Sequence, residues 1–234
     1  MEPIVEVVTE LRFQSGDKGK ISLLPGLIFN QFGKSFPNME ALAIPPIELE
    51  AFATSPTHRF HGADGIISVS RRTTAFGVVR PYPGWEIFRE RAYAVFKFVA
   101  QSGTFGEIDR ISIKYINLLP ATPTEDQLAL TNATINVGGR ILNNENFSLR
   151  AEFPKNGLTG IVQIITRAQT MPTERAPEPL EGIVLDIDVI ADGPFASKDI
   201  DGAMKMLDAA HTYEKELFFS LLNPSELEKY GPEY

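Results

Sequence analysis

The sequence predicts an α+β fold in which two similar halves form one long curved antiparallel sheet with helices on one face. Three observations predict it. Short segments of alternating apolar and polar residues recur along the chain, as in half-buried strands. Two amphipathic helix patterns stand near the ends of residues 1–104 and 105–234. The stretch 110–120 begins the second half as 3–13 begins the first. We expect the halves, 1–104 and 105–234, to be one integral unit.

The first half reads as strand, helix, four strands, helix. Ile4–Phe13 alternates apolar and charged side chains and predicts a strand. Residues 14–20 read as a turn, and 22–33 as a helix with apolar residues at three- and four-residue spacing. Short strand candidates follow, and an amphipathic helix over 85–99 ends the half. The four strand candidates are 47–53, 58–61, 65–70 and 74–80.

The second half repeats this order. Its first strand, 108–119, puts Tyr115 and Asn117 among isoleucines on one face. If helices cover that face, the hydroxyl and the amide need partners, because an unpaired buried polar group costs about 1–3 kcal/mol. A short helix over 122–130 and a long one from Ser197 to Leu222 are expected. The four strand candidates between them are 133–137, 146–153, 157–167 and 182–190, with a surface loop at Pro172–Glu181, and the tail 223–234 is expected to be partly disordered.

This order of elements is similar to the TATA-binding-protein-like, or helix-grip, arrangement. The resemblance implies that the last strand of each half lies beside its first strand, and that the sheet face opposite the helices is open. Two unrelated α+β lobes are the alternative.

Composition restricts the class of protein. The chain has 234 residues and no Cys, shows no signal-peptide pattern, and holds no apolar run of the roughly 18 residues that a membrane span needs. We therefore expect a cytoplasmic protein without disulfides and without a membrane. The net charge is −8, which argues against non-specific binding of nucleic acid by the whole molecule.

Short motifs along the whole chain resemble a family of sporadically distributed bacterial proteins of unknown function, defined by a numbered provisional model. They are Pro3, Glu6, Arg12-Phe13, Tyr115-Ile116-Asn117, Leu185-Asp186-Ile187-Asp188, His211 and Phe218-Phe219. Members often carry Arg where this chain has Lys114. The resemblance supports a single integral unit and implies no activity.

The first candidate site is a set of charges on the sheet face opposite the helices. Strand parity places seven charged residues there: Glu6, Glu10, Arg12, Arg110, Lys114, Asp186 and Asp188. One interpretation is a ladder of cross-strand ion pairs worth about 0.2–1 kcal/mol each. The other is a polar groove for a ligand or a partner. The neighbouring cations are expected to hold the carboxylates ionised, which argues against acid–base chemistry.

A second candidate is His211, one helical turn before Glu214. Such a pair shares a helix face and could hold a metal or relay a proton. The competing interpretation is a histidine satisfied by a buried hydrogen bond. With three His and no Cys in the chain, a zinc site is not expected.

The third candidate is a group of arginines with aromatic neighbours: Arg71, Arg72, Arg80, Tyr82, Trp85, Arg89 and Arg91. Arginine forks and rings suit phosphates and bases. Alternatively, Trp85 anchors the helix in the core while the arginines solvate turns. The chain has no phosphate-binding glycine motif and no nucleophile elbow.

The leading hypothesis is a cytoplasmic binding or interaction protein without a cofactor. It would use the open sheet face or the groove between the halves, with Arg12, Arg110, Lys114, Asp186, Asp188 and His211, to hold a protein partner or a small ligand. The alternative is a nucleotide or nucleic-acid binder that uses Arg71, Arg72, Arg80 and Tyr82. A third hypothesis is an enzyme built around His211, Glu214, Asp186 and Asp188. An exposed sheet edge would also allow a homodimer.

Overall fold

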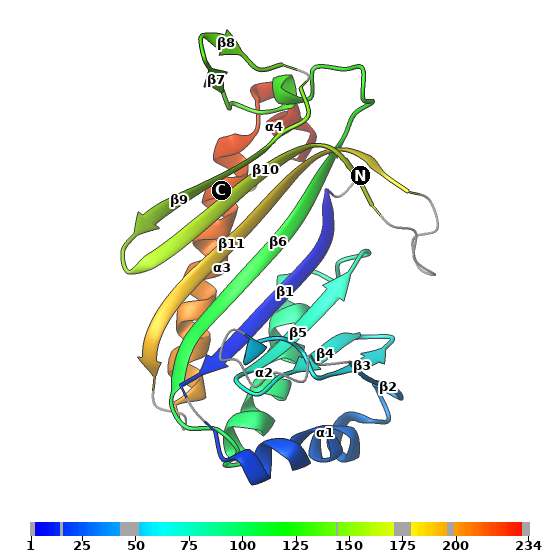
Figure 1. Cartoon of the computed structure of the whole chain (residues 1–234), viewed down its shortest axis with the longest axis vertical. Coiled ribbons are helices and arrows are strands. Elements are labelled where there is room, and N and C mark those ends of the chain that lie inside the picture. Colours follow the sequence, from blue (N-terminus) through cyan, green and yellow to red (C-terminus); the bar gives the residue numbers. More distant parts are fainter. Residues whose placement is uncertain are drawn as a thin grey trace.

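The computed structural model describes residues 3–14, 16–42, 52–143, 145–170, 179–195 and 199–230. Within them, one nine-stranded antiparallel sheet carries helices packed against it, so the α+β class is confirmed (Figure 1). The first half supplies β1 (Ile4–Phe13), α1 (Lys18–Phe32), β2 (Asn38–Ala41), β3 (His58–Gly62), β4 (Gly65–Val69), β5 (Thr73–Val79) and α2 (Trp85–Gln101). The second half supplies β6 (Ile108–Pro120), the 3₁₀ helix η2 (Gln127–Leu130), β7 (Asn136–Val137), β8 (Arg140–Ile141), β9 (Ser148–Lys155), β10 (Leu158–Gln169), β11 (Glu181–Phe195), α3 (Ile200–Leu221) and α4 (Pro224–Tyr230).

The strands follow the order β2-β3-β4-β5-β1-β6-β11-β10-β9. The first strand of each half lies in the middle of the sheet, because β1 pairs with β5 and β6, and β6 pairs with β1 and β11. The expected neighbourhood of first and last strands is therefore present in both halves. The prediction of a buried central strand over 108–119 is also confirmed.

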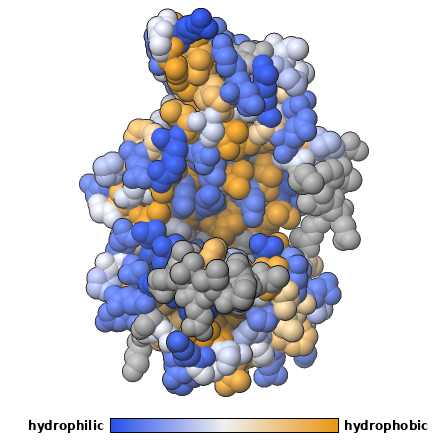
Figure 2. All heavy atoms as spheres, viewed as in Figure 1, coloured by the Kyte–Doolittle hydropathy of each residue, from blue (hydrophilic) through white to orange (hydrophobic). Residues whose placement is uncertain are grey.

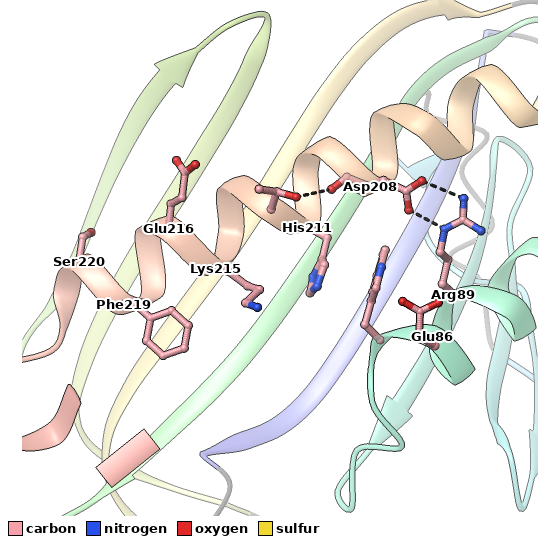
Figure 3. A pocket seen from close by; sticks show the side chains of 10 residues that line it. Glu86, Arg89, Asp208, His211, Lys215, Glu216, Phe219 and Ser220 are labelled. Carbon is pink, nitrogen blue, oxygen red and sulfur yellow. Dashed lines mark hydrogen bonds and ion pairs between the residues drawn. The ribbon is translucent and has the colours of Figure 1, made fainter. Parts of the chain in front are cut away.

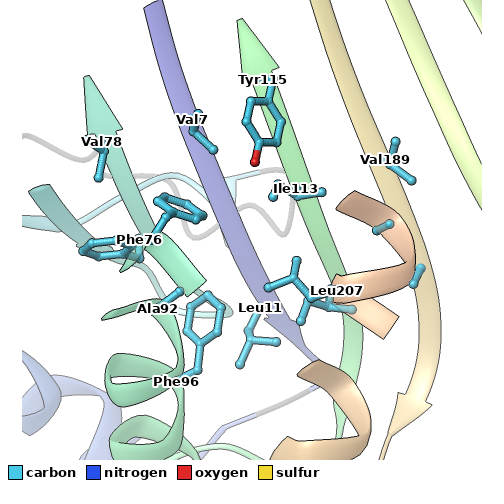
Figure 4. Close-up of a cluster of buried hydrophobic side chains, with 14 of the residues drawn as sticks. Val7, Leu11, Phe76, Val78, Ala92, Phe96, Ile113, Tyr115, Val189 and Leu207 are labelled. Carbon is cyan, nitrogen blue, oxygen red and sulfur yellow. The ribbon is translucent and has the colours of Figure 1, made fainter. Parts of the chain in front are cut away.

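Side-chain alternation along the central strands creates two different faces. The face toward the helices holds the core, which Figure 4 shows around Leu11, Ile113 and Leu207. The opposite face carries polar side chains such as Glu10 and Lys114 among apolar ones. Strands β9 to β11 pass in front of α3 in Figure 1, so Figure 2 shows this opposite face, hollowed at its middle, where polar and apolar side chains mix.

Helices α2 and α3 lie on the same face of the sheet and contact each other. The apolar stripe predicted for α2 is buried: Phe88, Ala92, Val95, Phe96 and Val99. Arg89 of α2 donates two hydrogen bonds to Asp208 of α3, from Nε at 2.5 Å and from Nη2 at 2.8 Å. This fork-to-carboxylate contact fixes the distance between the helices at one end.

Three elements differ from the prediction because local polar contacts decide them. Helix α1 begins at Lys18 inside the predicted turn, since the Asp17 side chain caps it by accepting from the Lys20 amide at 3.0 Å. Strand β2 lies at the edge of the sheet and pairs with β3, at residues for which no strand was predicted. The helix expected over 122–130 is reduced to η2, whose first turn Asp126 caps.

The tail prediction was wrong for Pro224–Tyr230, which form α4. Asn223 starts this helix because its side-chain oxygen accepts from the Glu226 amide at 2.8 Å. Tyr230 packs its ring near Phe218 of α3. The strand expected over 133–137 is only β7, which pairs with β8 in a separate two-stranded sheet.

Several predictions fall outside the described residues. They are most of the strand candidate 47–53, the cap at Ser197, and residues 172–178 of the predicted loop. The two described residues of the first candidate, 52–53, are not in a strand. Glu181, expected to end that loop, begins β11. Asp199 occupies the cap of α3, where its carboxylate accepts from the Gly202 amide at 2.9 Å. Among the described residues, none of the helices has the length and apolar character that crossing a membrane requires.

Candidate functional site

Two adjoining hollows open on the helix face, between the start of α2 and residues 208–220 of α3. Figure 3 shows the side chains that line the larger one. Their volumes are about 840 and 500 Å³, within the range of about 300–1,000 Å³ that is typical of small-molecule sites. They share Trp85, His211, Lys215 and Phe219, so we treat them as one site, the α2–α3 cleft. The larger hollow adds Glu86, Arg89, Asp208, Thr212, Glu216 and Ser220, and the smaller adds Pro3, Ile4, Tyr82, Tyr115, Asn117, Glu214, Phe218, Lys229 and Tyr230.

The stacked rings of Trp85 and His211 stand where the two hollows meet. Trp85 is the first residue of α2, and its ring lies 3.9 Å from the His211 ring, with 12° between the planes. Trp85 thus lines the cleft and also packs against the core, whereas the sequence offered these two roles as alternatives. Lys215 and Phe219 follow His211 at intervals of one turn along α3, as Figure 3 shows.

Hydrogen bonds join Tyr115 of the sheet to α3 and to the segment before α2. The Tyr115 hydroxyl lies 3.1 Å from His211 Nδ1 and 3.0 Å from the Tyr82 hydroxyl. Burial, aided by the nearby Lys215 charge, lowers the pKa of His211 to about 4, so the ring is neutral at pH 7. Tyr115 therefore has the hydrogen-bond partners that its burial was expected to require. The same geometry fits the interpretation of His211 as a buried, hydrogen-bonded histidine.

Glu214 is a buried side chain of the cleft that makes no hydrogen bond to the described residues. Its residue is 3% exposed, it lines the smaller hollow, and no hydrogen bond or ion pair joins it to the part of the chain that the structure describes. Burial raises the pKa of Glu214 to about 8, although the Lys215 charge acts in the opposite direction. At pH 7 the carboxyl therefore carries its proton and can donate a hydrogen bond as well as accept one.

Asn117 lies beside this carboxyl on the floor of the smaller hollow. It is 2% exposed, and its Nδ2 donates to the Leu185 carbonyl at 3.5 Å, the limit for a hydrogen bond. Helix α4 closes the same hollow with Lys229 and Tyr230. Lys229 is paired with Glu226. Sequence reasoning missed both α4 residues because we expected the tail to be partly disordered.

The sheet separates the predicted site residues into two groups. Arg12, Arg110, Lys114, Asp186 and Asp188 lie on the face away from the helices, whereas His211 lies in the cleft. The single site that the enzyme hypothesis required is therefore not formed, because the aspartates and the His211–Glu214 pair are on opposite sides of the sheet.

On the opposite face, the cross-strand ion pairs are present but incomplete. Lys114 Nζ donates to Asp186 at 3.1 Å, and Arg110 Nε donates to Asp192 at 2.8 Å. Asp188 lies opposite Lys114, yet its Oδ1 is buried without a hydrogen bond among the described residues, and so is Arg12 Nε.

Burial raises the pKa of Asp188, and the Lys114 charge offsets this rise only in part. The pKa of Glu10 is raised for the same reason, although Arg12 lowers it. The hollow on this face beside Glu6 measures about 290 Å³ and is smaller than either part of the cleft.

The four residues of the nucleic-acid alternative do not form one surface. Arg71 and Arg72 precede β5 and Arg80 and Tyr82 follow it, so about 25 Å of strand separates Arg72 from Arg80. Arg72 is held by the Phe13 carbonyl at 2.8 Å and by Asp109 at 3.7 Å.

No family model and no curated protein matches the chain. Within the described ranges, no three His, Asp or Glu side chains lie together in a way that could hold a metal ion. What the geometry itself defines is an α+β molecule with a ligand-sized cleft at the junction of its halves.

Proposed function

We propose that this protein binds a small molecule in the α2–α3 cleft, the groove between its two halves. The observation that carries the proposal is Glu214, a buried carboxyl without a partner at the wall of a 500 Å³ hollow. The carboxyl opens into the hollow, so a ligand there can bond to it in place of water. This proposal is a specific form of the binding-protein hypothesis.

The apolar lining of the cleft supports a ligand with a flat apolar body. Aromatic side chains supply large rigid contact areas with little loss of conformational entropy. Six of them line the smaller hollow: Tyr82, Trp85, Tyr115, Phe218, Phe219 and Tyr230. A few polar groups among apolar walls are the usual composition of a small-molecule site.

Two further parts of the proposal concern architecture and location in the cell. We propose that the sheet arose by internal duplication of a helix-grip unit, because β1 pairs with β5 as β6 pairs with β11. We also propose a cytoplasmic location and membership of the bacterial family of unknown function, on the composition and motifs given above. No observation favours the nucleic-acid alternative over the cleft.

The only tryptophan of the chain, Trp85, provides the test, because it lines both hollows. A metabolite library is screened for compounds that change Trp85 fluorescence and raise the melting temperature of the protein. Phe219→Ala, which removes a wall of the cleft, should weaken the binding of any hit. Lys114→Ala, on the opposite sheet face, should leave the affinity unchanged.

The reverse result for these two variants would place the site on the opposite face and contradict the proposal. A screen without any hit that is sensitive to Phe219→Ala would contradict it as well.

A further inference from the structure

Two side chains of the smaller hollow can donate a hydrogen bond to a ligand. Lys215 makes no ion pair within the described residues, although it lines both hollows. Glu214 presents an O–H at neutral pH and has no hydrogen-bond partner among these residues. Lys229 is already paired with Glu226. The missing counterpart is therefore an acceptor with a negative charge.

We propose that the ligand of the cleft is a small carboxylate with a flat apolar body, whose charge pairs with Lys215 and which accepts a hydrogen bond from Glu214. The inference rests on the proposed function and names the chemical class of its ligand. An organic cation would suit the aromatic walls, but it would meet the unpaired Lys215 charge. A carboxylate satisfies both groups at once.

Such binding must weaken at alkaline pH, because an ionised Glu214 repels an anion. The other titratable groups that line this hollow are Tyr82, Tyr115, His211, Lys215, Lys229 and Tyr230. His211 is already neutral at pH 7, and burial raises the pKa of Tyr230 above its ordinary value of 10. Glu214→Gln keeps all of these groups, so a loss of affinity that this variant abolishes comes from Glu214. Since the pKa of Glu214 is about 8, affinity should be about tenfold lower at pH 9 than at pH 7.

The experiment compares three probes that share one indole body: indole-3-acetate, indole-3-acetamide and tryptamine. Binding to the full chain is measured by isothermal titration calorimetry at pH 7 and pH 9. We expect indole-3-acetate to bind best, about tenfold or more above the other two at pH 7, and to lose affinity at pH 9.

Two variants separate the roles of the charged groups. Glu214→Gln keeps a neutral donor at the same place, so it should retain affinity at pH 7 and abolish the loss at pH 9. Lys215→Met keeps the apolar stem and should lower indole-3-acetate affinity about tenfold or more. Lys114→Met on the opposite face is the matched control and should change nothing.

The results distinguish the ligand class from the function itself. Best binding by tryptamine or equal binding by the amide would overturn the carboxylate class, while the cleft would remain a binding site. Loss of all binding in Glu214→Gln would overturn the class in the same way. If none of the probes binds but the library gives a cleft ligand, only the class fails; if neither gives binding, both proposals fail.

A different observation concerns β9, the last strand in the sheet order. The Phe147 carbonyl accepts from the Thr166 amide at 3.2 Å, so by alternation the backbone groups of Ala151 face β10. Those of Arg150 and Glu152 point outward, where the sheet has no further strand among the described residues.

The sequence of β9 is complementary to itself. In an antiparallel pair with a two-fold axis at Ala151, Arg150 lies opposite Glu152 of the second copy, and both have outward backbone groups. On the other side of the strand, Leu149 lies opposite Phe153 of the second copy. These two are 38% and 43% exposed in the single chain. Shifting the axis by two residues in either direction removes both matches.

We infer that two copies of this chain pair through β9 and continue the sheet across the dimer. Each cross-strand match then occurs twice, and charges of opposite sign meet on one face while apolar side chains meet on the other. Pro154, which has no N–H, lies opposite Ser148 of the second copy and marks the end of the ladder.

Charge exchange tests this inference. Arg150→Glu should convert a dimer into a monomer in sedimentation velocity, since like charges then face each other. Glu152→Arg should do the same, and the double exchange should restore the dimer. Both side chains are about half exposed, so neither single change threatens the fold.

A cysteine at the axis gives a second readout, because the chain has no Cys. Ala151→Cys should form a disulfide-linked dimer on mild oxidation, since opposed residues of this kind lie about 4.5 Å apart at Cα. Val137→Cys on exposed β7 is the control and should not. A monomeric wild type, or a dimer that resists Arg150→Glu, would overturn the inference.

Discussion

His211 and Glu214 lie one turn apart on α3, and burial moves their pKa values in opposite directions. The pKa of His211 falls from 6.5 to about 4, so the folded state loses stability as pH falls through this range. The pKa of Glu214 rises from 4.5 to about 8, so the folded state loses stability as pH rises through that range. Between about pH 4.5 and 6.5 the two effects oppose each other.

Single variants should expose the two slopes. Relative to wild type, Glu214→Gln should gain about 1.4 kcal/mol of unfolding free energy per pH unit between pH 5 and 7.5. The measurement is urea denaturation at several pH values. A difference that does not vary with pH would mean that Glu214 has an ordinary pKa.

His211→Phe keeps a ring against Trp85 and removes the titration. Relative to wild type, it should gain stability as pH falls from about 6.5 to 4.5, again by about 1.4 kcal/mol per unit. The constant cost of leaving Tyr115 with one partner fewer does not change this slope. A flat difference would contradict the assignment.

For single residues, the sequence predicted which buried polar side chains require a hydrogen-bond partner, but it did not predict which residues are those partners. Strand parity placed Tyr115 and Asn117 on the helix face and required a partner for the hydroxyl. It could not identify Tyr82 and His211 as those partners, because they are far away in the chain. Lys215 carries no sequence signal that separates it from any other exposed lysine on a helix.

Where β6 and β11 meet, the structure leaves no room for a side chain at Gly182. A Cβ at Gly182 would overlap the Leu119 carbonyl, which is backbone and cannot move aside. Gly182→Ala should therefore cost about 3 kcal/mol or more in thermal or chemical unfolding. Gly26→Ala in α1 is the matched control: its Cβ meets nothing within 4 Å, and it should stabilise the protein by about 0.5–1 kcal/mol. Equal effects of the two changes would contradict this account.

Long periodic elements could be predicted from the sequence, and short ones could not. Helix α2 and strands β1 and β6 have clear repeats and form as expected. Helix α4 has seven residues and little periodicity, and it is held by the Asn223 cap and by contact with Phe218. Such tertiary support is invisible in a local pattern.

For the whole molecule, the β1–β6 ladder joins the two halves in one sheet. Register pairs run from Ile4 opposite Asn117 to Phe13 opposite Ile108, and one core cluster spans both halves. We expect fragments 1–104 and 105–234 to be unfolded or aggregated alone and to form a complex when expressed together. Co-purification through a tag on one fragment is the measurement, and a well-dispersed NMR spectrum from fragment 1–104 alone would contradict it.

We predicted that the first and last strands of each half are neighbours. That prediction came from the resemblance in the order of elements, because no residue pattern encodes strand order directly. The cleft was foreseen only as a groove between the halves. Its chemistry depends on how closely α2, α3 and β6 approach, and that distance is a property of the packed molecule.

The position of β1 also has a consequence for synthesis. This strand leaves the ribosome well before either of its neighbours in the sheet, Thr73–Val79 and Ile108–Pro120, has been translated. Until then the nascent chain carries an apolar strand with two unpaired edges, which is the kind of segment that associates with other chains. Translation that stops before β6 would therefore leave an aggregation-prone product, whereas a stop within the last helix would leave the centre of the sheet complete.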